Sequence, residues 1–165
     1  MKILVFSDSH ASLRFMRRAI ETVKPDAVIH LGDYFDDGAA IAEEFHWIRF
    51  SQVPGNCDQH RCPPFAPMTL VEKICGVTLF MTHGHIHNVK LGLGSLISDG
   101  RKCGAQVVLF GHTHSTYCAQ EDDGLWVVNP GSCGYYGGSA ALIETDGGAI
   151  KACRILDQSA LDTMV

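Results

Sequence analysis

The 165-residue sequence lacks long apolar runs, paired cysteine motifs and any excess of positive charge. No stretch approaches the ~20 apolar residues that a membrane-spanning helix needs, so no membrane partner is expected. The N-terminal segment carries one lysine before a very short apolar run, which predicts a strand rather than a signal peptide. The seven cysteines are scattered and none belongs to a C-x-x-C pair. This pattern is typical of free thiols in a reducing cytoplasm, and we expect a cytoplasmic protein.

The balance of charges excludes a further class of partner. Lysine and arginine number 13 against 18 aspartates and glutamates, a net charge of −5. A negative chain is poorly matched to phosphate backbones, so strong nucleic-acid binding is not expected. Hydrophobic residues make up 46% and charged residues 19% of the chain, which is ordinary for a globular protein. Length and composition together predict a single domain over residues 1–165.

Apolar periodicity predicts alternating strands and helices in the first half. The expected strands are 3–7, 27–31 and 48–53, and the helices between them lie near 12–23 and 38–46. This βαβαβ order implies a parallel sheet.

The second half favours paired strands around turn residues. The expected pairs are 69–75 with 77–83, 116–120 with 125–128, and 140–145 with 149–155; a helix near 88–103 and a strand at 106–110 follow the first pair. We therefore expect an α/β fold in which two mixed sheets pack face to face with helices outside. The tail after Leu156 is expected to be mobile.

Five short polar stretches are the most informative part of the sequence, because they follow predicted strands. They are Asp8-Ser9-His10, Gly32-Asp33, Gly55-Asn56-Cys57-Asp58, His83-Gly84-His85 and Gly111-His112-Thr113-His114. The carboxyl ends of strands are where α/β sheets place their active sites. Carboxylate, amide and imidazole donors without thiolate favour Mn²⁺, Fe²⁺, Zn²⁺, Co²⁺ or Ni²⁺ over Ca²⁺ or Mg²⁺. The sequence therefore predicts a site for divalent transition metals.

The donor spacing suggests two ions and a phosphate ester as substrate. Asp8 and His10 are two residues apart and point the same way on an extended segment, whereas Asp33 has two oxygens that can bridge two ions. Two divalent ions carry four positive charges, and the two carboxylates and a bridging hydroxide together carry three negative ones. The site would keep roughly one net positive charge, which suits an anionic phosphoryl group. Hydrolysis by such a hydroxide needs no protein nucleophile, and Ser7, Ser9 and Thr113 have no assigned base.

With these motifs in this order, the chain resembles the calcineurin-like metallophosphoesterases. The run Asn129-Pro130-Gly131-Ser132 is similar to the compact YfcE-type phosphodiesterase branch, and that resemblance covers nearly the whole chain. The resemblance implies a four-layer αββα sandwich and two divalent ions. Mn²⁺ is the expected ion, with Fe²⁺, Ni²⁺, Co²⁺ or Zn²⁺ as alternatives. It also implies that one ion is held by Asp8, His10, Asp33 and His114, and the other by Asp33, Asn56, His83 and His112.

Three residues are candidates for a direct part in catalysis: Asp33, Asn56 and His85. Asp33 and Asn56 would act as metal ligands. His85, two residues after His83, would support the site from beside that ligand. His87, two residues further on, is expected to lie on the surface.

Two departures from the family pattern narrow the expected activity. Protein phosphatases of this superfamily carry a phosphate-clamping arginine where this chain has Asp37, and many members carry a leaving-group histidine where it has Cys57. Loss of a bidentate clamp weakens recognition of a dianion most. Loss of a general acid slows the hydrolysis of esters with poor leaving groups most. Both favour a small phosphodiester with a good leaving group as the substrate.

Two alternatives remain open from the sequence. One is a phosphomonoesterase or nucleotide phosphatase, and the other is a non-catalytic, retromer-like scaffold. A retromer subunit keeps the fold while losing metal ligands, and the seven ligand positions present here count against that alternative. Whether the chain forms a homo-oligomer is left open.

Overall fold

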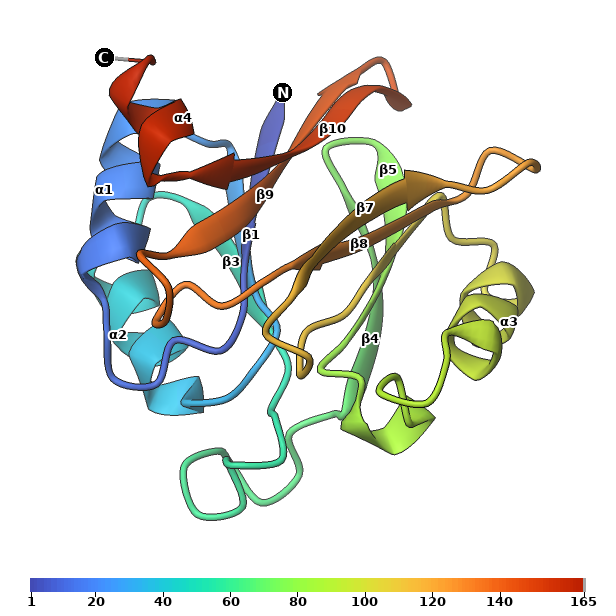
Figure 1. Ribbon diagram of the computed structural model, residues 1–165, viewed down its shortest axis with the longest axis horizontal. Coiled ribbons are helices and arrows are strands. Elements are labelled where there is room, and N and C mark those ends of the chain that lie inside the picture. The colour runs from blue at the N-terminus through green and yellow to red at the C-terminus, as the bar shows by residue number, and fades with distance from the viewer. Residues whose placement is uncertain (165) are drawn as a thin grey trace.

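The computed structural model describes residues 1–164, which form two mixed five-stranded sheets packed face to face (Figure 1). The first sheet contains β1 (Lys2–Phe6), β2 (Ala27–His30), β3 (Arg49–Gln52), β9 (Ser139–Asp146) and β10 (Ala149–Asp157), in the order β10-β9-β1-β2-β3. The second contains β4 (Thr69–Ile74), β5 (Val77–Thr82), β6 (Val107–Leu109), β7 (Thr116–Gln120) and β8 (Trp126–Pro130), in the order β4-β5-β6-β8-β7.

Helices cover the outer face of each sheet. Figure 1 shows α1 (Arg14–Val23), α2 (Phe35–Glu44) and α4 (Gln158–Asp162) on the first sheet, and α3 (Gly94–Lys102) on the second. A short 3₁₀ helix, η1 (His85–His87), follows β5. The predicted α/β sandwich of two mixed sheets flanked by helices is confirmed.

Alternating side chains explain why strands of both sheets are buried on two faces. In β1, Ile3 and Val5 face the core between the sheets, whereas Leu4 and Phe6 pack under α1. β6 repeats the pattern, with Val107 and Leu109 facing the other sheet and Val108 facing α3. Parallel pairing of β1 with β2 and of β2 with β3 brings their carboxyl ends to one edge of the sheet, as does the pairing of β5 with β6.

The expectation of a mobile tail after Leu156 is wrong for the described residues. β10 continues to Asp157, whose side chain then caps α4 by accepting a hydrogen bond from the Ala160 amide at 2.8 Å. Leu161 is fully buried beneath α1, and Arg18 pairs with Asp162. The cap, the burial of Leu161 and the Arg18–Asp162 ion pair attach this short helix to the first layer of helices. Val165 lies outside the described residues.

The predicted helix near 88–103 is also shorter than expected. Asn88 and Gly92 have positive φ values of 52° and 157°, so the chain turns twice before α3 starts at Gly94. Within residues 1–164, no helix has the length and apolar character needed to cross a membrane.

Candidate metal centre

The five polar stretches meet at the carboxyl ends of β1, β2, β3, β5 and β6, as the sequence predicts. The backbone there is unusual, because five of the seven expected ligands have left-handed φ angles of 45° to 67°. They are Asp8, His10, Asp33, His112 and His114. Non-glycine residues rarely adopt this conformation, and when they do they cluster at functional sites. The turns that hold these residues follow β1, β2 and β6.

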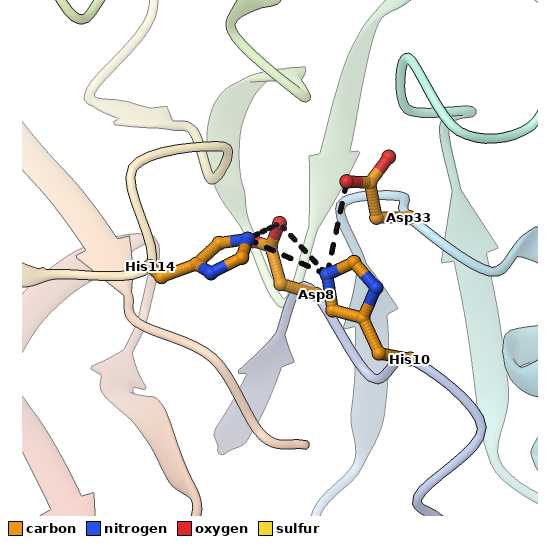
Figure 2. Close-up of side chains that lie close together, drawn as sticks. All are labelled: Asp8, His10, Asp33 and His114. Atoms are coloured by element: carbon orange, nitrogen blue, oxygen red, sulfur yellow. Dashed lines mark hydrogen bonds and ion pairs between the residues drawn. The ribbon is translucent and has the colours of Figure 1, made fainter. Parts of the chain in front are cut away.

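Four of the predicted ligands form one compact cluster. Asp8, His10, Asp33 and His114 each offer a donor atom, and these atoms all lie within 4.8 Å of one another. Figure 2 shows the His10 and His114 rings converging on the Asp8 carboxylate, with Asp33 facing them from the other side. His114 Nε2 lies 3.1 Å from Asp8 Oδ1, and His10 Nε2 lies 3.8 Å from Asp33 Oδ2.

The remaining ligands gather on the other side of Asp33. His83 Nε2 lies 3.2 Å from Asn56 Oδ1 and 3.5 Å from Asp33 Oδ1, and the His83 and His112 rings are 5.1 Å apart. The two oxygens of Asp33 therefore face different groups of donors, Oδ2 towards His10 and Oδ1 towards His83.

Asp8 is oriented for ligation from the floor of the site. It is fully buried, and its Oδ2 accepts hydrogen bonds from Ser7 Oγ at 2.6 Å and from the His112 amide at 3.1 Å. Its Oδ1 is buried with no hydrogen-bond partner among the described residues. Burial raises the pKa of Asp8 to about 7, with a smaller contribution from the charge of Asp33. A buried carboxylate oxygen without a donor is a position that a cation would stabilise.

His83 presents a lone pair to its neighbours. Its Nδ1 lies 2.8 Å from the carbonyl oxygen of Leu31, which can only accept, so Nδ1 carries the proton. Burial lowers the pKa of His83 to about 4, and the neutral ring therefore directs the Nε2 lone pair at Asn56 Oδ1 and Asp33 Oδ1. Three acceptor atoms facing one another repel unless a cation lies between them. The residues present fit divalent ions on this ground.

The position of Asp33 is set by the backbone around it. Its Oδ1 accepts a hydrogen bond from the Cys57 amide at 2.9 Å, and a Cβ at Gly55 would overlap the same oxygen. Burial acts to raise the pKa of Asp33, but nearby His83 and the Cys57 hydrogen bonds together hold it below its usual value. Asp33 is therefore ionised between the two groups of donors.

His85 lies beside the second group, as predicted, whereas His87 does not match its prediction. The His85 ring is 5.5 Å from that of His83 and 6.2 Å from that of His112. His87 was expected on the surface, but η1 turns it inward, where it is buried against Phe80 and lies 3.5 Å from Asp99.

Asp58 organises the site in a way that motif spacing did not predict. It is fully buried and accepts four backbone hydrogen bonds, from Asp33, Tyr34, Phe35 and Gly55, at 2.7 to 3.0 Å. One carboxylate thus ties the loop that carries Asp33 to the loop that carries Asn56. Its place two residues after Asn56 in the G-N-x-D stretch was the available signal.

His30 and Asn129 are two further supports that the sequence did not reveal. His30 is fully buried at the end of β2 and lies 3.2 Å from Ser9 Oγ, next to Asp8. Burial lowers its pKa to about 3. Asn129 donates to the Gly111 carbonyl at 2.9 Å and so holds the loop that carries His112 and His114.

The two departures from the family pattern have distinct structural roles. Asp37 accepts hydrogen bonds from Ser9 Oγ at 2.7 Å and from the Ala11 amide at 2.8 Å, so it secures the loop between Asp8 and α1. Cys57 is an exposed residue at the rim, where partial desolvation of its sulfur and the charge of Asp33 raise the pKa of its thiol to about 11. The thiol is therefore protonated at neutral pH.

Comparison with known proteins places this fold and site in a family. Residues 1–148 match the model of the calcineurin-like phosphoesterase superfamily domain. The chain is 31% identical over 166 aligned positions to the phosphodiesterase MJ0936 of Methanocaldococcus jannaschii, covering 88% of this chain and 94% of that protein. The chain belongs to the calcineurin-like phosphoesterase superfamily, whose members use divalent metals.

Solved structures extend the comparison. A predicted phosphoesterase from Streptococcus pneumoniae has a TM-score of 0.74 at 25% identity and covers 96% of this chain and 90% of its own. The phosphoesterase YfcE of E. coli has a TM-score of 0.64 at 23% identity, covering 93% and 98%. MJ0936 and the S. pneumoniae protein support a place in the compact phosphoesterase branch, and YfcE shows that the fold is shared. Vps29 of Entamoeba histolytica, solved in complex with zinc, shares the fold with a TM-score of 0.69 at 21% identity, covering 95% and 99%.

Proposed function

We propose that this chain is a phosphodiesterase that depends on two divalent transition-metal ions and acts on a small phosphodiester. The observation that carries the proposal is the division of Asp33 between two donor groups, Oδ2 towards His10 and Oδ1 towards His83. Likeness to a named phosphodiesterase over most of both chains supports the reaction class.

Each donor group would hold one ion. Asp8, His10, Asp33 and His114 would bind the first, and Asp33, Asn56, His83 and His112 the second. When bound, two such ions lower the pKa of a water and stabilise the attacking and leaving oxygens of a phosphate ester. The donor chemistry suits Mn²⁺, with Fe²⁺, Ni²⁺, Co²⁺ and Zn²⁺ as alternatives.

The chain's own residues orient these donors before any ion binds. Asn56 lies with its amide oxygen towards His83, at 3.2 Å from Nε2, and its amide nitrogen 3.5 Å from Cys57 Sγ. The Leu31 carbonyl selects the His83 tautomer that leaves Nε2 free. His85 lies beyond His83 and His112, within reach of a group bound at the second ion, and we assign it to substrate positioning.

A diester is favoured over a monoester by what surrounds the donors. Asp37 adds a carboxylate where a clamping arginine would stand, and Arg61 is occupied, since it stacks over Tyr34 at 4.1 Å and pairs with Asp36 at 3.0 Å. A monoanionic diester needs less compensating charge than a dianionic monoester. The protonated Cys57 thiol is a poor proton donor, because its pKa is about 11, so a good leaving group is favoured.

The test is a ratio of kcat/KM values for bis-p-nitrophenyl phosphate and p-nitrophenyl phosphate. Protein stripped by chelation should be inactive, and Mn²⁺ should restore hydrolysis that favours the diester. A preference for the monoester by tenfold, or ~1.4 kcal/mol of transition-state stabilisation, would contradict the proposal and favour a monoesterase.

This chain shares its fold with Vps29, so a role as a non-catalytic scaffold is the second candidate function. Inertness towards both esters with Mn²⁺, Fe²⁺, Co²⁺, Ni²⁺ and Zn²⁺ would favour that function. The same series identifies the preferred ion.

A further inference from the structure

One wall of the metal centre is aromatic. The Tyr135 ring lies 4.9 Å from the His10 ring at an interplanar angle of 34°, and 5.5 Å from the His114 ring at 31°. Tyr34 meets His10 edge-on from another direction, at 5.2 Å and 63°. One phenol ring therefore packs against two of the proposed ligands in tilted contacts.

Tyr135 is held in place by the loop formed by residues 131–138. Ser132 Oγ donates to the Asp8 carbonyl at 2.7 Å, and the Tyr135 amide donates to Ser132 Oγ at 3.0 Å. Gly134 lies so close to the Ser9 backbone that a Cβ would overlap its carbonyl oxygen. The loop is thus fastened to the same turn that carries Asp8, and a ring set by these contacts loses little freedom on binding.

The outward side of this loop is open. Tyr135 is 46% exposed, and its neighbour Tyr136 is 94% exposed with a left-handed φ of 53°. With His114, Thr113 and Ser115 the two tyrosines line a hollow of about 570 Å³. We call it the tyrosine hollow. Its size lies within the range of small-molecule sites.

A second hollow of different chemistry lies beside the other donor group. It measures about 640 Å³ and is lined by polar side chains that include Asn56, Asp36 and Arg61. A phosphorus atom held between the donor groups would have one substituent directed to each side. The two substituents of a diester therefore meet unlike surroundings, aromatic beside His114 and charged beside Asn56.

We infer that Tyr135 and Tyr136 determine substrate specificity by stacking on a planar aromatic substituent of the phosphate ester, such as a nucleobase, in the tyrosine hollow. The inference rests on the proposed function for the placement of the phosphate. Stacking on tyrosine tolerates any base, because every base has a π-face. Thr113 and Ser115 give the same hollow a polar rim.

Binding to the Mn²⁺-loaded protein tests this without turnover. Calorimetry would compare thymidine 5′-monophosphate with 2-deoxyribose 5-phosphate, which differs from it by the missing base. We expect thymidine 5′-monophosphate to bind about tenfold more tightly. Tyr135→Ala and Tyr136→Ala should each reduce that ratio severalfold, whereas Tyr135→Phe should keep it, because stacking needs the ring and not the hydroxyl.

Trp47→Ala is the matched control, since Trp47 is 69% exposed and lies between α2 and β3, and it should leave the ratio unchanged. Equal affinity of the unsubstituted protein for the two phosphates would overturn the inference. So would alanine variants that weaken both phosphates equally, because Tyr135 would then only position His10 and His114. Hydrolysis of bis-p-nitrophenyl phosphate, measured on the same samples, reports separately on the proposed function.

Discussion

The floor and the mouth of the metal centre are built differently. The floor consists of Asp8, Asp33 and His83, which are at most 3% exposed, and each has a backbone partner. The mouth consists of Asn56, His10, His112 and His114, which are half-buried or exposed and lie mainly against other donor side chains. The floor is therefore set by folding, whereas the mouth depends on what binds to it. Both regions supply metal-ligand candidates, and substrate choice is assigned to the tyrosine hollow and to Cys57, which border the mouth.

The largest effect should come from removing charge at the floor. Asp33→Asn keeps the shape but replaces the carboxylate whose two oxygens face different donor groups. Activity should fall by more than the ~10–100-fold typical of residues that only orient metal ligands. Bound metal, measured by elemental analysis, should drop to one ion or none. Unchanged metal content with retained turnover would remove Asp33 from the bridging position.

Asp58→Asn probes how strongly the floor depends on its backbone ties. An amide group cannot accept from all four amides, so its NH₂ would face donors across a buried space. We expect the free energy of unfolding to fall by about 3 kcal/mol. Urea denaturation of the metal-free protein measures this loss. Asp122→Asn, at an exposed turn, is the control and should change stability little. A loss that exceeds the control's by no more than the measurement error would mean that these hydrogen bonds contribute nothing.

The buried His30 should make the free energy of unfolding depend on pH. Its pKa is lowered to about 3 in the folded protein from 6.5, so the unfolded chain binds the proton more readily below pH 6.5. This contribution to stability is present above pH 6.5 and is lost as pH falls towards 3. Between pH 7.5 and pH 5 it amounts to about 2 kcal/mol.

Substitution isolates this contribution from other titrating groups, since the raised pKa of Asp8 acts in the opposite direction. Metal-free His30→Gln should lose about 2 kcal/mol less than the unsubstituted protein between those pH values. His46→Gln, at an exposed position, should behave like the unsubstituted protein. Parallel pH profiles for His30→Gln and the unsubstituted protein would show that His30 is not neutral in the fold.

The smallest effect is expected from a substitution at Cys57, which borders the mouth. Cys57→His places an imidazole at the rim, where its backbone amide already contacts Asp33. Hydrolysis of diesters with poor leaving groups should rise by up to about tenfold, less than the ~10²–10⁴-fold of a fully positioned acid. Activated diesters should gain little. Cys57→Ala controls for loss of the thiol, and an equal gain in both variants would exclude proton donation by the new ring.

The sequence predicted the metal-ligand candidates better than the residues that support and border them, for physical reasons. Strands with alternating or continuous apolar residues and polar groups directly after them are local patterns, so Asp8, Asp33 and His83 could be placed together. The roles of Asp58, Asp37 and Tyr135 could not, because they depend on which loops approach one another from distant parts of the sequence. The burial of His87 and of Leu161 likewise follows from turns whose geometry no periodicity reveals.

The most direct test of the two-ion account is a titration of chelated protein with Mn²⁺, in which bound ions and diester hydrolysis are followed together. Two ions should bind per chain, and hydrolysis should appear only as the second ion loads. Full activity reached with one ion per chain would contradict the account, because Asp33 would then have no second ion to bridge.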